Sequence, residues 1–142
     1  MLYVLNITIP PSTSKDKPIE AEIEINEPIL KRVSCFFPPG VCCLAGFRIL
    51  YGTDQIFPKP DGEYVTGHAE TVSGDIYFRV PELPCKLRIQ CFNEDTKYQH
   101  TLYIRLETAE AIEYLTLQRL EEIIQLLRYM IYKFTGEYIV FW

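Results

Sequence analysis

The first hundred or so residues alternate between apolar and polar side chains with a period of two, in one segment after another. In residues 19–26, apolar side chains alternate with three glutamates and one asparagine, and the same alternation returns in 75–80, 85–91 and 100–107. Successive side chains of a strand point to opposite faces, so this pattern predicts strands with one buried and one solvated face. Residues 2–9, 29–37 and 41–51 are also strand-like but partly apolar on both faces, which indicates covered strands.

Turn-forming segments rich in proline and glycine separate these runs and are expected to end each strand, at 10–11, 27–28, 38–40, 58–62, 73–74 and 81–84. Many short strands with no helical interval predict a mainly β fold, an antiparallel two-sheet β-sandwich of about eight strands. A jelly-roll-like form is the one we expect. An immunoglobulin-like sandwich is an open alternative, because strand order cannot be read from periodicity.

The character of the sequence changes at Thr108. All ten prolines lie at or before position 84, and residues 108–135 contain neither glycine nor proline. Thr108 is suited to cap the start of a helix, and Gly136 is suited to end it in the left-handed conformation. The sequence therefore predicts a β-sandwich domain over 1–107, and one long C-terminal helix with a short terminal strand over 108–142.

The predicted helix carries apolar residues in steps of three and four, a heptad-like seam that Ile123, Leu126 and Met130 widen. At about 1.5 Å per residue the helix would be roughly 42 Å long, whereas a strand of about eight residues spans only about 26 Å. It would overhang its own sandwich, unless it wrapped that sandwich diagonally. The chain after the predicted helix ends in an uncharged tail, residues 138–142, which has strand propensity and needs a pairing partner. We therefore expect an assembly interface that comprises Leu117, Leu120, Ile124, Leu127, Ile131, Phe134, Tyr138, Phe141 and Trp142.

No motif for a metal, a cofactor or catalysis occurs in the sequence. Cys42 and Cys43 are adjacent, so in a strand they would point to opposite faces and could not share an ion, and Cys-x-x-Cys spacing is absent. A nucleophile elbow and a phosphate-binding loop are also absent. The acids within residues 54–70 could form a carboxylate pair at a loop end, but turn and edge roles explain them more simply. We expect no metal, no cofactor and no enzymatic activity.

The remaining cysteines have predicted places in strands. Cys85 and Cys91 share the apolar face of their strand, so we expect both to be buried and unligated. A hairpin about residues 38–39 would set Cys35 opposite Cys42, where they could bridge in an oxidising interior.

Charge and the N-terminal sequence limit the classes of partner. A net charge of -5 argues against non-specific nucleic-acid binding, which needs a basic face. The N-terminal residues lack the basic region and long apolar core of a secretory signal, and no apolar run reaches the roughly 18 residues of a membrane span. We expect a protein made in the cytoplasm, not secreted through a signal peptide, with no membrane and no nucleic-acid partner.

One alternative function is a carbohydrate-binding β-sandwich module. Jelly rolls include lectins, and aromatic side chains on a wet strand face could form a platform for sugars. The candidates are Tyr64, Tyr77, Tyr98 and Tyr103. Aromatic residues on a wet face are equally typical of protein contacts.

The stretch from Arg32 to Arg105 resembles the small β-sandwich structural and decoration-type proteins encoded by tailed viruses of bacteria and archaea. The segments that carry this resemblance are Phe36-Phe37-Pro38-Pro39-Gly40, Gly46-Phe47-Arg48-Ile49-Leu50-Tyr51-Gly52, Gln55-Ile56-Phe57-Pro58 and Asn93-Glu94-Asp95. The resemblance implies a virion structural protein, a capsid decoration or cement protein or a head-assembly subunit. It also implies a homo-oligomer, a trimer above all, that binds a larger capsid-type protein in the virion.

Overall fold

The computed structural model describes residues 1–136, with side chains described for 1–110 and 119–136. Its elements follow one another as β1 (Leu2–Ile9), β2 (Ile19–Ile25), β3 (Ile29–Phe37), β4 (Ala45–Tyr51), β5 (Asp54–Phe57), β6 (Val65–Thr66), β7 (Glu70–Arg79), β8 (Cys85–Asn93), β9 (His100–Ala109) and α1 (Ala111–Thr135).

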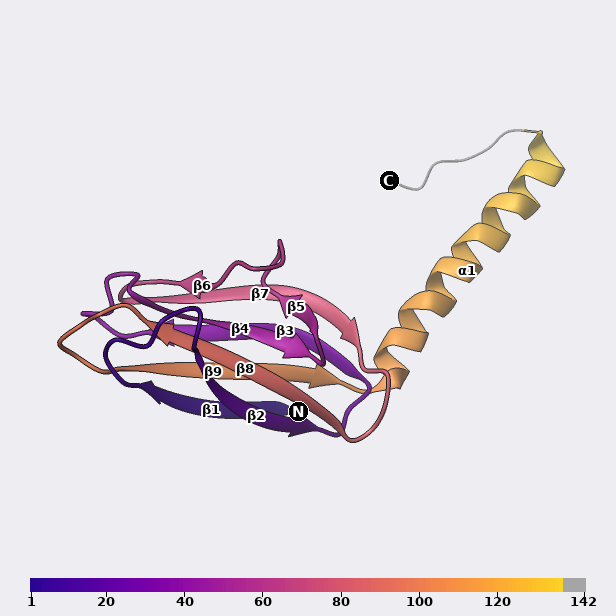
Figure 1. Ribbon diagram of the computed structural model, residues 1–142. Coiled ribbons are helices and arrows are strands. Elements are labelled where there is room, and N and C mark those ends of the chain that lie inside the picture. The colour runs from indigo at the N-terminus through magenta and orange to yellow at the C-terminus, as the bar shows by residue number, and fades with distance from the viewer. Residues whose placement is uncertain (137–142) are drawn as a thin grey trace. The chain divides into compact units, whose positions relative to one another are not determined.

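The strands form two antiparallel sheets, in the orders β1-β9-β3-β7 and β2-β8-β4-β5, and β6 also pairs with β4 (Figure 1). The pairing is nested from the ends of the chain inward. The first strand pairs with the last, β2 pairs with β8, β3 with β7, and β4 with β5 and β6. Such nesting is that of one long hairpin rolled into two facing sheets, which is the jelly roll. The predicted sandwich is confirmed, and the strand order selects the jelly roll over the immunoglobulin-like alternative.

The core lies between the two sheets and is built from the alternation that the sequence shows. In β8, Cys85, Leu87, Ile89 and Cys91 are fully buried, while Lys86 between them is exposed. The facing strands β3 and β9 contribute every second residue in the same way, so both sheets turn an apolar face inward. Burial of each large side chain contributes roughly 1.5–3 kcal/mol, which makes this layer the main source of stability.

The predicted hairpin about residues 38–39 is wrong. Strands β3 and β4 belong to different sheets, and the segment between them crosses from one sheet to the other. Proline has no backbone N–H to continue a ladder, so the strand ends there. As a consequence Cys35 is buried in the core and Cys42 is exposed on a turn, and all five cysteines are free thiols.

Two strand boundaries also differ from the sequence prediction. Cys42 and Cys43 lie in a tight turn with φ of 50° and 60°, and β4 begins only at Ala45. Conversely, Gly74 does not end a strand but lies inside β7. A Cβ added at Gly74 would lie 2.9 Å from a ring carbon of Phe57, so glycine here permits close packing between strands.

The chain divides into two compact units, Met1–Ala109 and Glu110–Trp142. Thr108 does not cap the helix, because it is the ninth residue of β9, and Glu110 in an extended conformation precedes α1 instead. The predicted helix end is confirmed: Gly136 has φ of 72°, and its N–H donates to the carbonyl oxygen of Tyr132 at 2.7 Å. The predicted terminal strand falls in residues outside the described range.

Candidate functional site

Helix α1 presents a broad apolar surface to solvent. Of the predicted interface residues, Leu120 is 51% exposed, Leu127 is 48% exposed and Phe134 is 86% exposed. Ile124 is exposed and Ile131 is half-buried, and both continue the same row along the helix. We refer to residues 117, 120, 124, 127, 131 and 134 as the seam. The side chain of Leu117, and Tyr138, Phe141 and Trp142, lie outside the described part of the chain.

The apolar surface extends beyond the residues that the sequence singled out as the interface. The further exposed apolar and aromatic side chains of α1 are Ile123, Leu126, Tyr129, Met130 and Tyr132. The two tyrosines were missed because a seam drawn in steps of three and four includes only one stripe of the helix. Their signal is compositional, since the second half of α1 carries aromatic or aliphatic residues on nearly every side.

Two charged residues of α1, Glu121 and Arg128, lie beside the seam. Glu121 and Arg128 each follow a seam leucine by one position, so they flank the same side of it. Lys133 lies in the last turn, where it opposes the helix dipole, and its ammonium nitrogen is 5.3 Å from the ring centroid of Tyr129.

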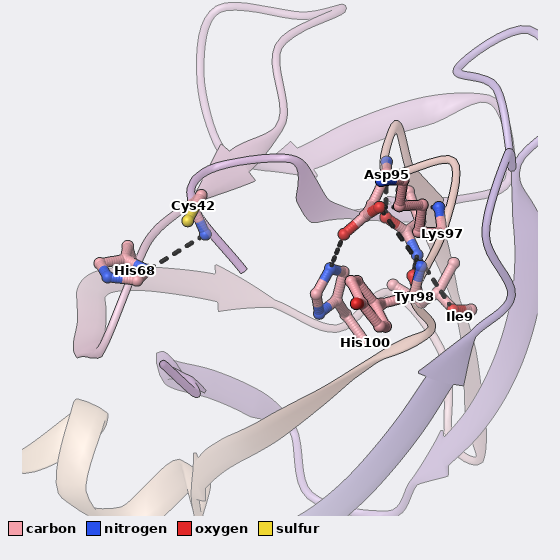
Figure 2. Close-up of polar contacts among 8 residues, drawn as sticks. Ile9, Cys42, His68, Asp95, Lys97, Tyr98 and His100 are labelled. Atoms are coloured by element: carbon pink, nitrogen blue, oxygen red, sulfur yellow. Dashed lines mark hydrogen bonds and ion pairs between the residues drawn. The ribbon is translucent and has the colours of Figure 1, made fainter. Parts of the chain in front are cut away.

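Both histidines of the sandwich hold loops in place (Figure 2). The ring Nδ1 of His68 accepts a hydrogen bond from the backbone N–H of Cys42 at 3.1 Å, which fixes the turn before β4. The ring Nε2 of His100 lies 2.8 Å from Oδ2 of Asp95 in the loop between β8 and β9. These contacts explain the positions of both rings without a ligand.

Asp95 organises the loop between β8 and β9. Its Oδ1 accepts hydrogen bonds from the backbone N–H groups of Lys97 at 2.9 Å and Tyr98 at 3.3 Å. The N–H of Lys97 above all, and then the ring of His100, hold the pKa of the Asp95 carboxyl below its usual value. Buried Asn93 closes the loop from inside, because its Nδ2 donates to the carbonyl oxygens of Ile9 and Tyr98.

Two of the acids between residues 54 and 70 make local contacts. Asp61 forms an ion pair with Lys59 at 2.8 Å, and Glu70 accepts a hydrogen bond from the backbone N–H of His68. Gln55 is buried, and its side-chain amide donates to the carbonyl oxygens of Pro58 and Glu63. Among the residues whose placement is described, no group of three histidine, cysteine or acidic side chains could hold a metal ion.

The four tyrosines considered for sugar binding are spread over the sandwich. Tyr103 lies on the outer face of its sheet, with its ring centroid 6.1 Å from that of Phe36. Tyr77 lies on edge strand β7, and Tyr98 lies in the loop before β9. Tyr64 packs edge-on against Phe92 of β8, with 4.8 Å between ring centroids. The four tyrosines therefore do not share one platform, and Tyr103 forms an exposed aromatic pair with Phe36.

Comparison of the chain with protein-family models gives no match, and comparison with curated proteins gives none either. In the described part of the chain, no helix combines the length and the apolar character needed to cross a membrane.

Proposed function

We propose that this chain is a virion structural protein, a capsid decoration or cement protein or a head-assembly subunit, that acts through protein–protein contacts. The observation that carries the proposal is the apolar face of α1, on which Leu120, Leu127 and Phe134 are about half or more exposed. Soluble proteins rarely leave a contiguous apolar patch of this kind open, and such patches mark interaction surfaces. Covering the seam would contribute roughly 1.5–3 kcal/mol per fully buried side chain, enough to drive association.

The jelly roll supports this proposal. The fold is common in viral capsid proteins, although it also occurs in lectins, so the site and not the fold has to decide the function. The resemblance of residues 32–105 to decoration-type proteins of tailed viruses points in the same direction. Under this proposal the chain self-associates, in threes by that resemblance, binds a larger capsid-type protein and has its place in the virion.

The proposal includes no catalytic activity for this chain. His68 uses Nδ1 to accept a backbone N–H, and His100 is paired with Asp95, so the residues best suited to proton transfer serve the loops. Asp61 and Glu70, from the acidic segment, are paired with Lys59 and with a backbone N–H.

The test of the proposal replaces Ile124 and Leu127 together with glutamate. We expect the double variant to keep the far-ultraviolet circular dichroism of the sandwich, to lose the self-association that depends on α1, and to be absent from purified virus particles. The matched control changes Gln118 and Gln125 to glutamate, which adds the same charge to the side of the helix away from the seam. A double variant that still occurs in particles at the wild-type level would contradict the proposal.

One observation favours the carbohydrate-binding alternative. Phe36 and Tyr103 are each more than one third exposed and lie side by side on the outer face of the sheet β1-β9-β3-β7. Glycan-array binding that disappears in Tyr103→Ala but persists in Ile124→Glu/Leu127→Glu would support sugar recognition over assembly.

A further inference from the structure

We infer that α1 pairs with α1 of a second copy of this chain in an antiparallel arrangement about a two-fold axis. This inference rests on the proposed function and names the partner of the exposed apolar face. It concerns a contact between two copies, distinct from the threefold contact that the resemblance implies.

The seam repeats in the order a, d of a heptad, with Leu117, Ile124 and Ile131 at a and Leu120, Leu127 and Phe134 at d. Because it begins at an a position and ends at a d position, it is complementary to itself when one copy is reversed. Each a residue then meets a d residue of the second copy. The central layer joins Ile124 to Leu127, and the next joins Leu120 to Ile131.

The residues that flank the seam decide the orientation. On one side, at the e positions, are Glu121 and Arg128; on the other side, at the g positions, are Ile123 and Met130. In an antiparallel pair e faces e and g faces g, whereas in a parallel pair g faces e. Reversal therefore sets Glu121 near Arg128 of the second copy, and Ile123 near Met130 of the second copy. The two members of each pair are offset by only two residues, or about 3 Å along the axis.

A parallel pair would match these flanks poorly. It would place apolar Ile123 beside the guanidinium group of Arg128. The antiparallel pair matches charge with opposite charge and apolar with apolar side chains. By two-fold symmetry it makes both the ionic and the apolar contact twice.

The first experiment reverses the charges in the full chain. We expect Glu121→Arg and Arg128→Glu each to weaken pairing roughly tenfold, since each sets two like-charge contacts in place of two opposite ones. The double variant Glu121→Arg/Arg128→Glu restores opposite charges, so its dissociation constant should return to within about threefold of wild type. Glu122→Arg is the matched control, because position 122 points away from the seam. Dissociation constants come from sedimentation equilibrium, with circular dichroism to check the fold.

The second experiment reads the orientation by disulfide formation in a Cys42→Ser/Cys43→Ser background. Leu120→Cys/Ile131→Cys should give a covalent dimer under mild oxidation, because these positions face each other across the antiparallel pair. Within one helix they are about 16 Å apart and cannot bridge. Leu120→Cys alone should remain uncrosslinked, since the two copies of position 120 would also lie about 16 Å apart.

Each result decides the inference. Crosslinking of Leu120→Cys alone, equal pairing in single and double charge variants, or a monomeric wild-type chain would overturn it. If the wild-type chain is a monomer but Ile124→Glu/Leu127→Glu is absent from virus particles, the pairing inference fails and the proposed function is still supported. A chain that pairs as inferred but is absent from particles would overturn the proposed function alone.

Discussion

Thr108 donates two hydrogen bonds to the carbonyl oxygen of Met1, from its backbone N–H at 2.8 Å and from Oγ1 at 3.2 Å. The amino group of Met1 returns a third bond to the carbonyl oxygen of Thr108 at 3.1 Å. These bonds join the N-terminal end of the sandwich to its last strand, three residues before α1 begins at Ala111. The last residues of β9 therefore belong to the sandwich and not to the helix.

Replacement of Thr108 by valine keeps its shape and removes the hydroxyl donor. We expect a loss of about 1 kcal/mol in the free energy of unfolding, because Thr108 is buried and its hydroxyl cannot turn to water instead. Urea unfolding followed by circular dichroism measures this loss. Thr8→Val is the control, since the hydroxyl of exposed Thr8 meets that of Thr101 at the surface; it should change stability by less than about 0.5 kcal/mol. Equal effects of the two replacements would show that the Met1 contact adds nothing.

The loop between β8 and β9 should make the free energy of unfolding depend on pH in the acidic range. The pKa of Asp95 is lower in the folded chain than the unfolded value of about 3.9, so its stabilisation is complete above that pH. It is lost as the pH falls through the folded pKa. We expect the wild-type protein to lose more stability than Asp95→Asn when the pH is lowered from about 5 to about 2, as measured by urea midpoints. Parallel pH profiles for the two proteins would contradict this assignment.

The five thiols should fall into two reactivity classes. Burial raises the pKa of Cys35 and Cys91 to about 12, and it also raises the pKa of Cys85. Since the thiolate is the reactive form, these three should resist iodoacetamide in the native protein, while exposed Cys42 and Cys43 react. Peptide mass spectrometry after native alkylation identifies the labelled positions. Rapid labelling of Cys35 or Cys91 at neutral pH would mean that the two sheets separate.

Gly46 should not tolerate a side chain. A Cβ at this position would clash with the carbonyl oxygen of Val65 and would lie 2.8 Å from a ring carbon of Phe92. Because the nearest atom belongs to the backbone of β6, it cannot rotate away, and we expect Gly46→Ala to lower the free energy of unfolding by roughly 1–3 kcal/mol. A thermal midpoint equal to that of wild type would show that β6 is free to shift.

The sequence was sufficient to predict the strands that have one face in the core and the other face toward solvent. Residues 85–91 alternate because one face of β8 is in the core, and that contrast is local to the strand. The nested strand order depends on contacts between distant segments, which periodicity does not encode. The turn at Cys42 and Cys43 was missed because neither residue is a typical left-handed residue, and its stabilising partners, Gly67 and His68, are distant in sequence.

For the helix, the seam was visible from spacing alone, and Leu120, Leu127 and Phe134 are exposed in the structure. The start of α1 was misplaced because Thr108 has the chemistry of a cap, yet its hydroxyl is used by Met1. A local capping preference was overridden by a contact between residues 107 positions apart.

The measurement that bears most directly on the account is the mass of the full chain in solution, by size-exclusion chromatography with light scattering, for wild type and Ile124→Glu/Leu127→Glu. We predict that the wild-type protein has an even multiple of the chain mass of 16.6 kDa, and that the double variant folds but has at most half of the wild-type mass. A wild-type mass of one chain, or an oligomer that the double variant leaves intact, would contradict the claim that the apolar face of α1 is an association surface.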